Sequence, residues 1–273
     1  MTGAAAPTPR VHRDIVSFVR RSTRMNASQL RNWDAHHAEW VVPLAHRATS
    51  TSVAPGQLFA PEAIWGRTAP LWVEIGTGNG EACAAIAARH PEVNYLGFEV
   101  FTPAMASALG MIARAGLTNV RLAEVDGVDA LRHWIPAGSV DRILTFFPDP
   151  WHKARHHKRR LVSPATAALV ASRLRPGGSW HLATDWPDYA EHMREVLDGR
   201  RDLVNPHLAS AGSGDRESTD LRFVAGDGRG DGWAPRPDAR PLTRFEQRGL
   251  AAGRPIRDLV YVRTDAPVED ADV

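Results

Sequence analysis

The sequence predicts an α/β fold built on a doubly wound, mostly parallel β-sheet. From Leu71 onward, short apolar runs alternate with segments of helical pattern, which is typical of parallel strands joined by helices. A glycine-rich turn, Gly76 to Gly80, joins the first apolar run to the first helical segment. Acidic residues stand at or just after the ends of the later runs. Because parallel strands end along one edge of a sheet, these acids predict a ligand site there.

Local signals place the elements in order. The strands are short apolar runs, expected at residues 71–75, 95–100, 120–125, 140–147, 179–183 and 258–263. The helices are expected at residues 81–89, 103–115, 129–134, 164–174 and 187–197. Ser163 and Pro164 are an N-cap and a first helical residue, and Gly116 is a natural stop after the second helix.

The chain divides into three parts by composition. We expect a flexible basic N-terminal arm at 1–32, a single domain at 33–265 with a flexible Gly/Asp-rich insertion near 212–240, and an acidic tail at 266–273. The 33 basic and 31 acidic residues give a formal net charge of only +2, so the uneven distribution of charge is more informative than its total.

The composition also bears on location. The one cysteine, Cys83, excludes an intrachain disulfide, and its Ala-rich surroundings predict that it is buried. There is no apolar stretch of membrane-spanning length and no signal-peptide pattern at the N-terminus. We therefore expect a cytoplasmic protein without a membrane partner, and no obligatory protein partner is evident.

The most informative segment is Trp151 to Arg160, which reads WHKARHHKRR. It contains five Lys or Arg, three His and no acid, and it follows the run from Phe146 to Pro150 that carries Asp149. A carboxylate at a strand end beside a basic loop predicts an active site that meets a polyanion such as RNA or DNA. A solvated basic turn is the alternative. The five cations disfavour a divalent metal at the three histidines, so no metal is expected.

The turn from Gly76 to Gly80 has G-x-G-x-G spacing and lies between Glu74 and Glu81. These carboxylates would repel a pyrophosphate, and they suit a cationic ligand such as S-adenosylmethionine. Glu99 ends the second strand, where an acid accepts hydrogen bonds from ribose hydroxyls. Asp126 follows the third strand, where the adenine edge would lie. An ordinary tight turn and an exposed strand-end acid are the alternatives.

Five segments together resemble a known family. EIGTGNG, GFEV, FFPDPWHKARHHKRRL, ATDWPDYAEHM and RPLTRFEQRG are similar, in this order, to the bacterial tRNA (guanine-46-N7)-methyltransferases, from about Arg20 to Arg263. The fourth-strand segment is the most specific of them. The family usually has lysine where Arg244 stands, and the insertion looks longer than usual.

The resemblance implies a class I, Rossmann-like methyltransferase that transfers a methyl group from S-adenosylmethionine to N7 of guanine 46 in the variable loop of tRNA. It implies that Asp149 is catalytic. The implied cofactor-binding residues are Glu74, Gly76, Gly78, Gly80, Glu99, Asp126 and Asp149. The implied substrate-binding residues are Lys153, Asp185, Thr243, Arg244, Phe245 and Glu246. The implied RNA-binding residues are Arg155, His156, His157, Lys158, Arg159 and Arg160.

The chemistry of guanine adds a hypothesis about base recognition. Its N1–H and N2–H₂ groups are adjacent donors, which the carboxylates of Asp185 and Glu246 would accept after the base leaves its stack. Three alternatives remain: a class I methyltransferase acting on another RNA, a protein or a small molecule; a non-catalytic RNA-binding protein; and a dehydrogenase, which the glycine spacing disfavours.

Overall fold

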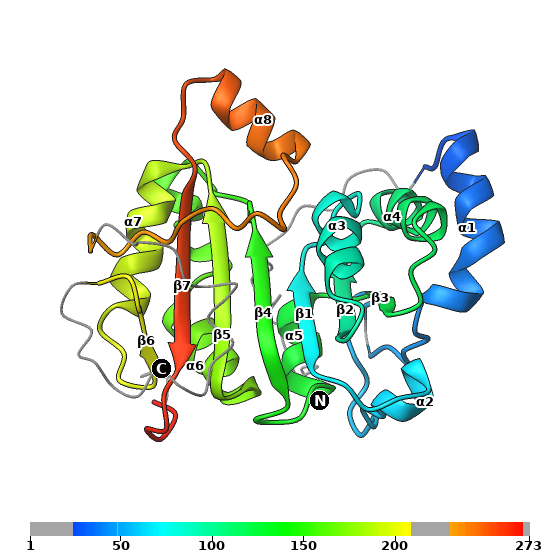
Figure 1. Cartoon of the computed structure of the whole chain (residues 1–273), viewed down its shortest axis with the longest axis horizontal. Coiled ribbons are helices and arrows are strands. Elements are labelled where there is room, and N and C mark those ends of the chain that lie inside the picture. Colours follow the sequence, from blue (N-terminus) through cyan, green and yellow to red (C-terminus); the bar gives the residue numbers. More distant parts are fainter. Residues whose placement is uncertain (1–23, 48, 209–229, 270–273) are drawn as a thin grey trace, which may run out of the picture.

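The computed structural model describes residues 24–47, 49–208 and 230–269. It has a seven-stranded sheet in the order β3-β2-β1-β4-β5-β7-β6 (Figure 1). The strands are β1 Leu71–Ile75, β2 Asn94–Glu99, β3 Val120–Glu124, β4 Val140–Phe146, β5 Leu174–Thr184, β6 Leu203–Val204 and β7 Arg257–Arg263. Strands β1 to β5 pair in parallel, β7 is antiparallel to β5, and β6 is antiparallel to β7. The predicted doubly wound, mostly parallel α/β fold is confirmed.

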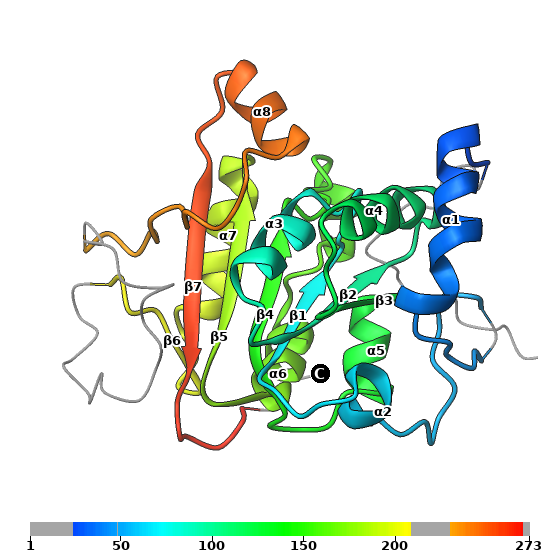
Figure 2. The ribbon, with the colours of Figure 1, turned by 45° about the vertical axis from the view of Figure 1, so that its right-hand side comes forward.

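Helices cover both faces of the sheet (Figure 2). The helices are α1 Ala27–Trp40, α2 Pro61–Trp65, α3 Glu81–Arg89, α4 Thr102–Arg114, α5 Gly127–His133, α6 Pro164–Arg173, α7 Pro187–Leu197 and α8 Arg244–Ala251, with a 3-10 helix η1 at Ala154–Arg159. One core cluster packs α3 and α4 against the sheet, and the other packs α5, α6 and α7. Cys83 of α3 is fully buried, as predicted. None of the helices in the described ranges is long and apolar enough to cross a membrane.

The predicted elements agree with the structure to within one or two residues, apart from the start of β5, and the sequence did not predict α1, α2, α8, β6 or η1. Strand β5 begins at Leu174 because this residue already pairs with Val140, ahead of a register shift. Helix α1 begins at Ala27, inside the arm expected at 1–32. A capping box between Asn26 and Gln29 fixes its start. Residues 1–23 of the arm lie outside the described residues.

The expected insertion at 212–240 falls partly outside the described residues, which resume at 230. Residues 230–240, the described part of that insertion, run back across the sheet. The amide of Ala234 donates a 2.8 Å hydrogen bond to the carbonyl of Asp258 on β7. Arg240 is 1% exposed. This segment leads into α8, which rises above the carboxyl ends of β4 and β5 (Figure 1).

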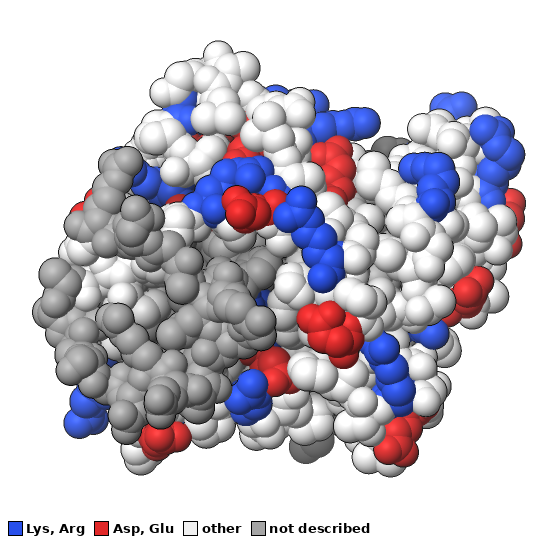
Figure 3. Space-filling model, in the orientation of Figure 1, with Lys and Arg blue, Asp and Glu red and all other residues white. Residues whose placement is uncertain are grey.

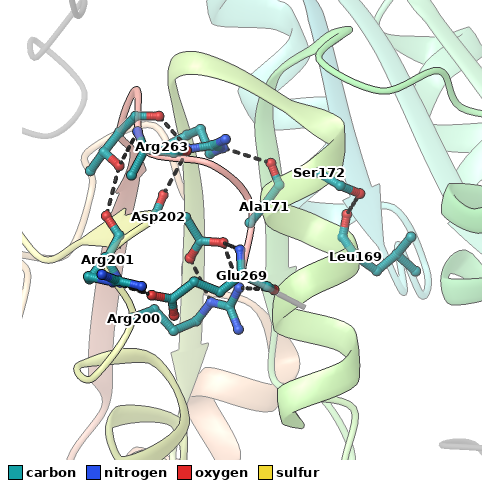
Figure 4. Close-up of polar contacts among 10 residues, drawn as sticks. Leu169, Ala171, Ser172, Arg200, Arg201, Asp202, Arg263 and Glu269 are labelled. Carbon is teal, nitrogen blue, oxygen red and sulfur yellow. Dashed lines mark hydrogen bonds and ion pairs between the residues drawn. The ribbon is translucent and has the colours of Figure 1, made fainter. Parts of the chain in front are cut away.

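The start of the expected acidic tail is tied to the opposite edge of the sheet (Figure 4). The amide of Glu269 donates a 2.8 Å hydrogen bond to the buried carboxylate of Asp202, which also pairs with Arg200 at 2.6 Å. Arg263 at the end of β7 donates to the carbonyl of Ala171 at 3.0 Å. These contacts lie far from the carboxyl ends of the parallel strands, because β7 runs antiparallel to them. They serve the fold rather than the candidate site.

Candidate active site

The loop between β1 and α3 contains three glycines with positive φ, of 81° at Gly76, 53° at Gly78 and 85° at Gly80. Residues with side chains rarely adopt this conformation. A Cβ atom would meet nothing within 4 Å at Gly76 or Gly78, whereas at Gly80 it would lie 2.6 Å from Cβ of Ala108 on α4. The first two glycines therefore border open space, and the third lets the start of α3 approach α4.

Glu99, the last residue of β2, is bonded to this loop. Its Oε2 accepts a hydrogen bond from the amide of Gly78 at 2.7 Å, and its Oε1 accepts from the amides of Val100 and Phe101 at 2.8 and 2.9 Å. Burial raises the pKa of Glu99, the amides oppose this, and the charge of Asp149 adds to the rise. Two bonds fill the capacity of Oε1, so Oε2 retains capacity to accept from a ligand.

Glu74 lies beneath the loop, within β1, and is 2% exposed. Its Oε2 accepts a hydrogen bond from the hydroxyl of Tyr95 at 2.8 Å. The pKa of Glu74 is raised to about 8. Burial is the largest cause of this rise, the hydrogen bond from Tyr95 opposes it, and the charge of Glu99 adds to it. The Glu74 carboxyl is therefore mostly protonated at neutral pH, and it would ionise more readily beside a cation.

The loop after β4 holds Asp149 between two residues of strained conformation. Phe147 and Trp151 have φ of 52° and 47°, although neither is glycine. Such strain persists where the surrounding structure enforces it, and it is common at functional sites. The Asp149 side chain is exposed, and its charge acts on Glu99. The acids at the end of β2 and after β4 therefore lie on one edge of the sheet, because these strands are parallel neighbours of β1.

Asp126 lies just after β3, as predicted, and caps α5. Its carboxylate accepts a 2.9 Å hydrogen bond from the amide of Val128. Burial raises its pKa, and the amide bonds to Val128 and Asp129 oppose this rise. The carboxylate therefore serves the start of α5. A contact between Asp126 and the adenine of a cofactor therefore stays a proposal.

The predicted basic loop is largely at the surface. Lys153, Arg155 and Lys158 are exposed, and His156 and His157 are partly exposed. The guanidinium of Arg159 lies 3.7 Å from the centroid of the Trp151 ring. Burial and then the neighbouring cations, Arg155 first among them, lower the pKa of His156. The loop therefore presents a concentrated positive charge directly after Asp149.

Arg160 is the exception within this loop. The sequence predicts an RNA contact for it, but it is only 5% exposed. Its guanidinium pairs with Asp188 on α7 and donates to the carbonyl of Pro150 at 3.1 Å. It also lies 4.9 Å from the centroid of the Tyr189 ring. We therefore revise its role: Arg160 fastens the loop that carries Asp149 to α7.

The predicted substrate loop from Thr243 to Glu246 is the first turn of α8. Thr243 is the N-cap, and its hydroxyl accepts from the amide of Glu246 at 3.3 Å. The amide of Arg244 donates to Glu81 at 2.8 Å, and its side chain pairs with the same carboxylate at 3.1 Å. Glu81 begins α3, so this pair holds α8 over the glycine loop.

The surface of α8 is mostly uncharged on the face drawn in Figure 3. Phe245 is 56% exposed, and its expected contact with the substrate stays a prediction. Glu246 points the other way and is 1% exposed. Its carboxylate pairs with Arg236 at 2.6 Å and with Arg240 at 3.3 Å. The prediction that Glu246 accepts from guanine does not fit this placement, because both oxygens are engaged inside the protein.

Asp185 follows β5 and faces α8. A Cβ atom at Gly249 would lie 2.6 Å from Cβ of Asp185, so the helix packs directly on this residue. Arg254, three residues after the end of α8, donates to Oδ2 of Asp185 through Nε at 2.9 Å and Nη2 at 2.7 Å. Asp185 keeps partial exposure, with 21% of its side chain accessible.

Comparison with known proteins identifies the family. Residues 68–219 match the model of a family described as a putative methyltransferase. The tRNA (guanine-N(7)-)-methyltransferase of Cutibacterium acnes is 48% identical over 263 residues, 96% of this chain and 88% of that protein. The protein of the same name from Methylococcus capsulatus is 45% identical, over 92% of this chain and 95% of its own length. The chain belongs to the tRNA (guanine-N7)-methyltransferase family.

The resemblance inferred from the five sequence segments is thereby confirmed. The match to the tRNA (guanine-N7)-methyltransferases runs through the glycine loop, the Asp149 loop, the basic loop and α8, because the alignment covers almost the whole chain. Among solved structures, the 16S rRNA methyltransferase KamB aligns with a TM-score of 0.44 and 17% identity, over 74% of this chain and 92% of its own. The family assignment does not depend on that alignment.

Sequence reasoning missed two arginines at the site of this family member. Arg254 pairs with Asp185, and Arg240 is buried against Asp258 and Glu246 with its guanidinium 5.6 Å from the ring centroid of Phe147. Arg254 stands in no motif, whereas Arg240 opens the R-P-L-T-R-F-E-Q-R-G segment that also contains Glu246. For Arg240, the sequence offers only its position close to the T-R-F-E segment. That position does not indicate which acid the arginine pairs with.

Proposed function

We propose that this protein transfers the methyl group of S-adenosylmethionine to N7 of a guanine in tRNA, at position 46 of the variable loop, in the cytoplasm. The proposal rests mainly on one observation: the basic loop follows directly after the acids at the carboxyl ends of the parallel strands. Asp149 stands between Glu99 on the cofactor side and the exposed cations of the basic loop. A cationic small ligand and a polyanion would therefore meet at Asp149. The relatives from Cutibacterium acnes and Methylococcus capsulatus are named for this activity.

The residues present fit S-adenosylmethionine. The open space at Gly76 and Gly78 admits a ligand close to the backbone. Oε2 of Glu99 retains the capacity to accept from a ribose hydroxyl, and Glu74 would ionise beside the ammonium group. The site lies outside the carboxyl ends of β1 and β4, where the strand order reverses. Ligands bind at this point in open α/β sheets.

The reaction does not require the protein to remove a proton from the attacking atom. The cofactor supplies an electrophilic methyl group: its C–S bond breaks as the C–N7 bond forms, and positive charge moves from sulfur to the base. Guanine N7 has an in-plane lone pair and needs no deprotonation. The protein must align N7 with the methyl carbon and place negative potential beside the developing cation. Asp149, exposed next to the cofactor site, is the residue we assign to both tasks.

The decisive experiment is nucleoside analysis of tRNA after incubation with the purified protein and S-adenosylmethionine. The expected product is 7-methylguanosine, and substitution of guanine 46 in the tRNA should abolish its formation. Bulk protein and ribosomal RNA serve as competing acceptors. If folded protein methylates one of these and leaves tRNA unmodified, the proposal is wrong. The alternative of a class I methyltransferase with another acceptor would then hold.

We expect Glu99→Ala to weaken cofactor binding by roughly 1–3 kcal/mol, because the variant leaves the amide of Gly78 and the ribose hydroxyls without an acceptor. Isothermal titration calorimetry with S-adenosylhomocysteine measures the change. Glu124→Ala is the matched control, because Glu124 stands opposite Glu99 in register on β3 and bonds to Thr102 instead. Equal affinities of Glu99→Ala and wild-type protein would remove Glu99 from the cofactor site.

The basic loop should supply phosphate contacts through Lys153, Arg155 and Lys158. The affinity for tRNA should fall steeply with salt. Neutralising Arg155 and Lys158 should flatten the slope of log K against log salt by about one unit per lost contact at most. Filter binding over a salt series measures this slope. Arg201→Ala is the control, because this residue is 87% exposed at the opposite edge of the sheet. A double variant with the wild-type slope would show that the loop does not meet phosphate.

A further inference from the structure

Arg240 stands at the centre of a buried ion-pair cluster that connects α8 to β7. Its guanidinium donates to both oxygens of Asp258 on β7, with Nη2 at 2.9 Å from Oδ2. Nη2 also donates to Glu246 on α8 at 3.3 Å. The side chain of Arg240 is fully buried. Because it pairs with two buried carboxylates at once, its guanidinium has one defined orientation.

The charges of this cluster are balanced. Arg236 pairs with Glu246 at 2.6 Å, so that two arginines face two carboxylates. His181 bonds to Asp258 at 2.8 Å, and burial lowers the pKa of His181, which keeps its ring neutral at pH 7. Removal of one charge from such a cluster leaves another charge buried and unpaired. The cluster therefore gives Arg240 a fixed place against which other side chains can pack.

The guanidinium of Arg240 lies against two aromatic rings at the end of β4. It is 5.2 Å from the ring centroid of Phe146 and 5.6 Å from that of Phe147. A cation is attracted to the face of an aromatic ring at such distances. Phe147 is the first residue after β4 and begins the loop that carries Asp149. A cluster built on α8 and β7 thus reaches the start of this loop.

The conformation of Phe147 requires support from its surroundings. Its φ of 52° lies in the left-handed region, which a residue with a side chain adopts only where neighbouring groups enforce it. The amide of Phe147 donates to the carbonyl of Ala183 on β5 at 2.7 Å, and the ring lies against Arg240. Only Pro148 separates Phe147 from Asp149, and proline has a fixed φ. The backbone direction set at Phe147 therefore carries over to Asp149.

We propose that Arg240 is a positioning residue that holds Phe147 in its strained conformation and thereby fixes the carboxylate of Asp149 beside the reacting base. The inference rests on the proposed function. Because Arg240 is fully buried, its effect on the reaction passes through Asp149 rather than through a contact with RNA. The inference also gives the buried Glu246 a role. By pairing with Arg240, this acid of α8 acts on the same loop without meeting the base.

The test is a double-mutant cycle, measured as single-turnover methylation of tRNA at saturating tRNA and cofactor. The four proteins are the wild type, Arg240→Lys, Asp149→Ala and the variant with both changes. Arg240→Lys keeps the buried positive charge but loses the planar fork that bonds both oxygens of Asp258. Arg200→Lys is the matched control. The Arg200 side chain is only 8% exposed and bonds both oxygens of the buried Asp202, far from the carboxyl ends of the parallel strands.

With Asp149 present, Arg240→Lys should lower the rate by about tenfold or more, because a small displacement of a catalytic group is costly. In the background of Asp149→Ala, the same substitution should change the rate by less than about twofold, because the carboxylate that it positions is gone. The affinity for tRNA should stay within about twofold of the wild type, since the exposed cations of the basic loop are unchanged. Arg200→Lys should lower the unfolding temperature but keep the wild-type rate.

Phe147→Gly allows the same cycle without disturbing the buried charges. Glycine adopts a positive φ without strain, so the substitution removes the ring and leaves the backbone conformation accessible. We expect a rate loss similar to that of Arg240→Lys, which should again disappear in the background of Asp149→Ala. Combining Phe147→Gly with Arg240→Lys should cause no further loss. This second cycle gives an answer even if Arg240→Lys fails to fold.

Two results would overturn the inference. Equal fold losses from Arg240→Lys with and without the Asp149 carboxylate would mean that Arg240 does not act through that carboxylate. A wild-type rate in folded Arg240→Lys and folded Phe147→Gly would mean that neither residue positions the loop. Failure of the proposed function is distinct from both results, because it would appear in the wild type as an absence of 7-methylguanosine, before any variant is compared.

Discussion

Replacing Asp149 with alanine should reduce the rate of methyl transfer by about 10²–10³-fold, which is the usual effect of removing one preorganised electrostatic partner of a transition state. Asp149 is exposed at the end of β4, between the cofactor side and the basic loop, and its charge acts on Glu99. As positive charge moves from sulfur to guanine, a fixed carboxylate beside the base stabilises the product side. Single-turnover methylation of tRNA at saturating cofactor measures this loss.

The fold of the variant should survive, because other residues hold the loop. Arg160 donates to the carbonyl of Pro150, and the amide of Phe147 donates to the carbonyl of Ala183 at 2.7 Å. Asp149→Asn should also be slow, because it keeps the shape without the charge. Asp238→Ala, which removes an exposed carboxylate elsewhere, should have the wild-type rate. A near-normal rate in Asp149→Ala with normal thermal unfolding would remove Asp149 from the reaction.

The parts of this site that could be predicted from sequence are those with local causes. The turn at Gly76, Gly78 and Gly80 needs positive φ, which glycine supplies, so the sequence itself marks the loop. Glu99 ends β2 and Asp149 lies three residues after the end of β4, and parallel strands bring such ends to one edge of the sheet. The prediction that both acids face the same site therefore depended only on strand order.

The parts that could not be predicted depend on partners distant in the sequence. Arg160 resembles its basic neighbours, yet Asp188 and Tyr189 on α7 bury it. The sequence suggests that Glu246 is an acid in a loop that recognises the base, yet its side chain is buried and paired with Arg236 and Arg240. The direction of a side chain on a short segment depends on what packs against it. Residue type alone could not separate the exposed member of each group from the buried one.

The second large effect that we expect is a dependence of the unfolding free energy on pH, which is caused by Glu74. Burial raises the pKa of this carboxyl from its usual 4.5 to about 8 in the folded protein. In the unfolded chain the group ionises near its usual value. Between these two values the folded state binds the proton more tightly, so unfolding releases it. The contribution of Glu74 to stability is therefore full below about pH 4.5 and is lost as the pH rises toward 8.

The slope of this loss should be about 1.4 kcal/mol of unfolding free energy per pH unit within the window. Glu74→Gln keeps an acceptor for the Tyr95 hydroxyl and cannot ionise, so it should lack this slope. Relative to the wild type, the variant should become steadily more stable from pH 5 to pH 8 in urea unfolding. Glu92→Gln is the control, because Glu92 is exposed and should leave the slope unchanged. Parallel pH profiles for wild type and Glu74→Gln would show that Glu74 ionises normally in the folded protein. The buried acid would then already be a carboxylate before any cationic ligand arrives, and a cofactor ammonium group would not be needed to ionise it.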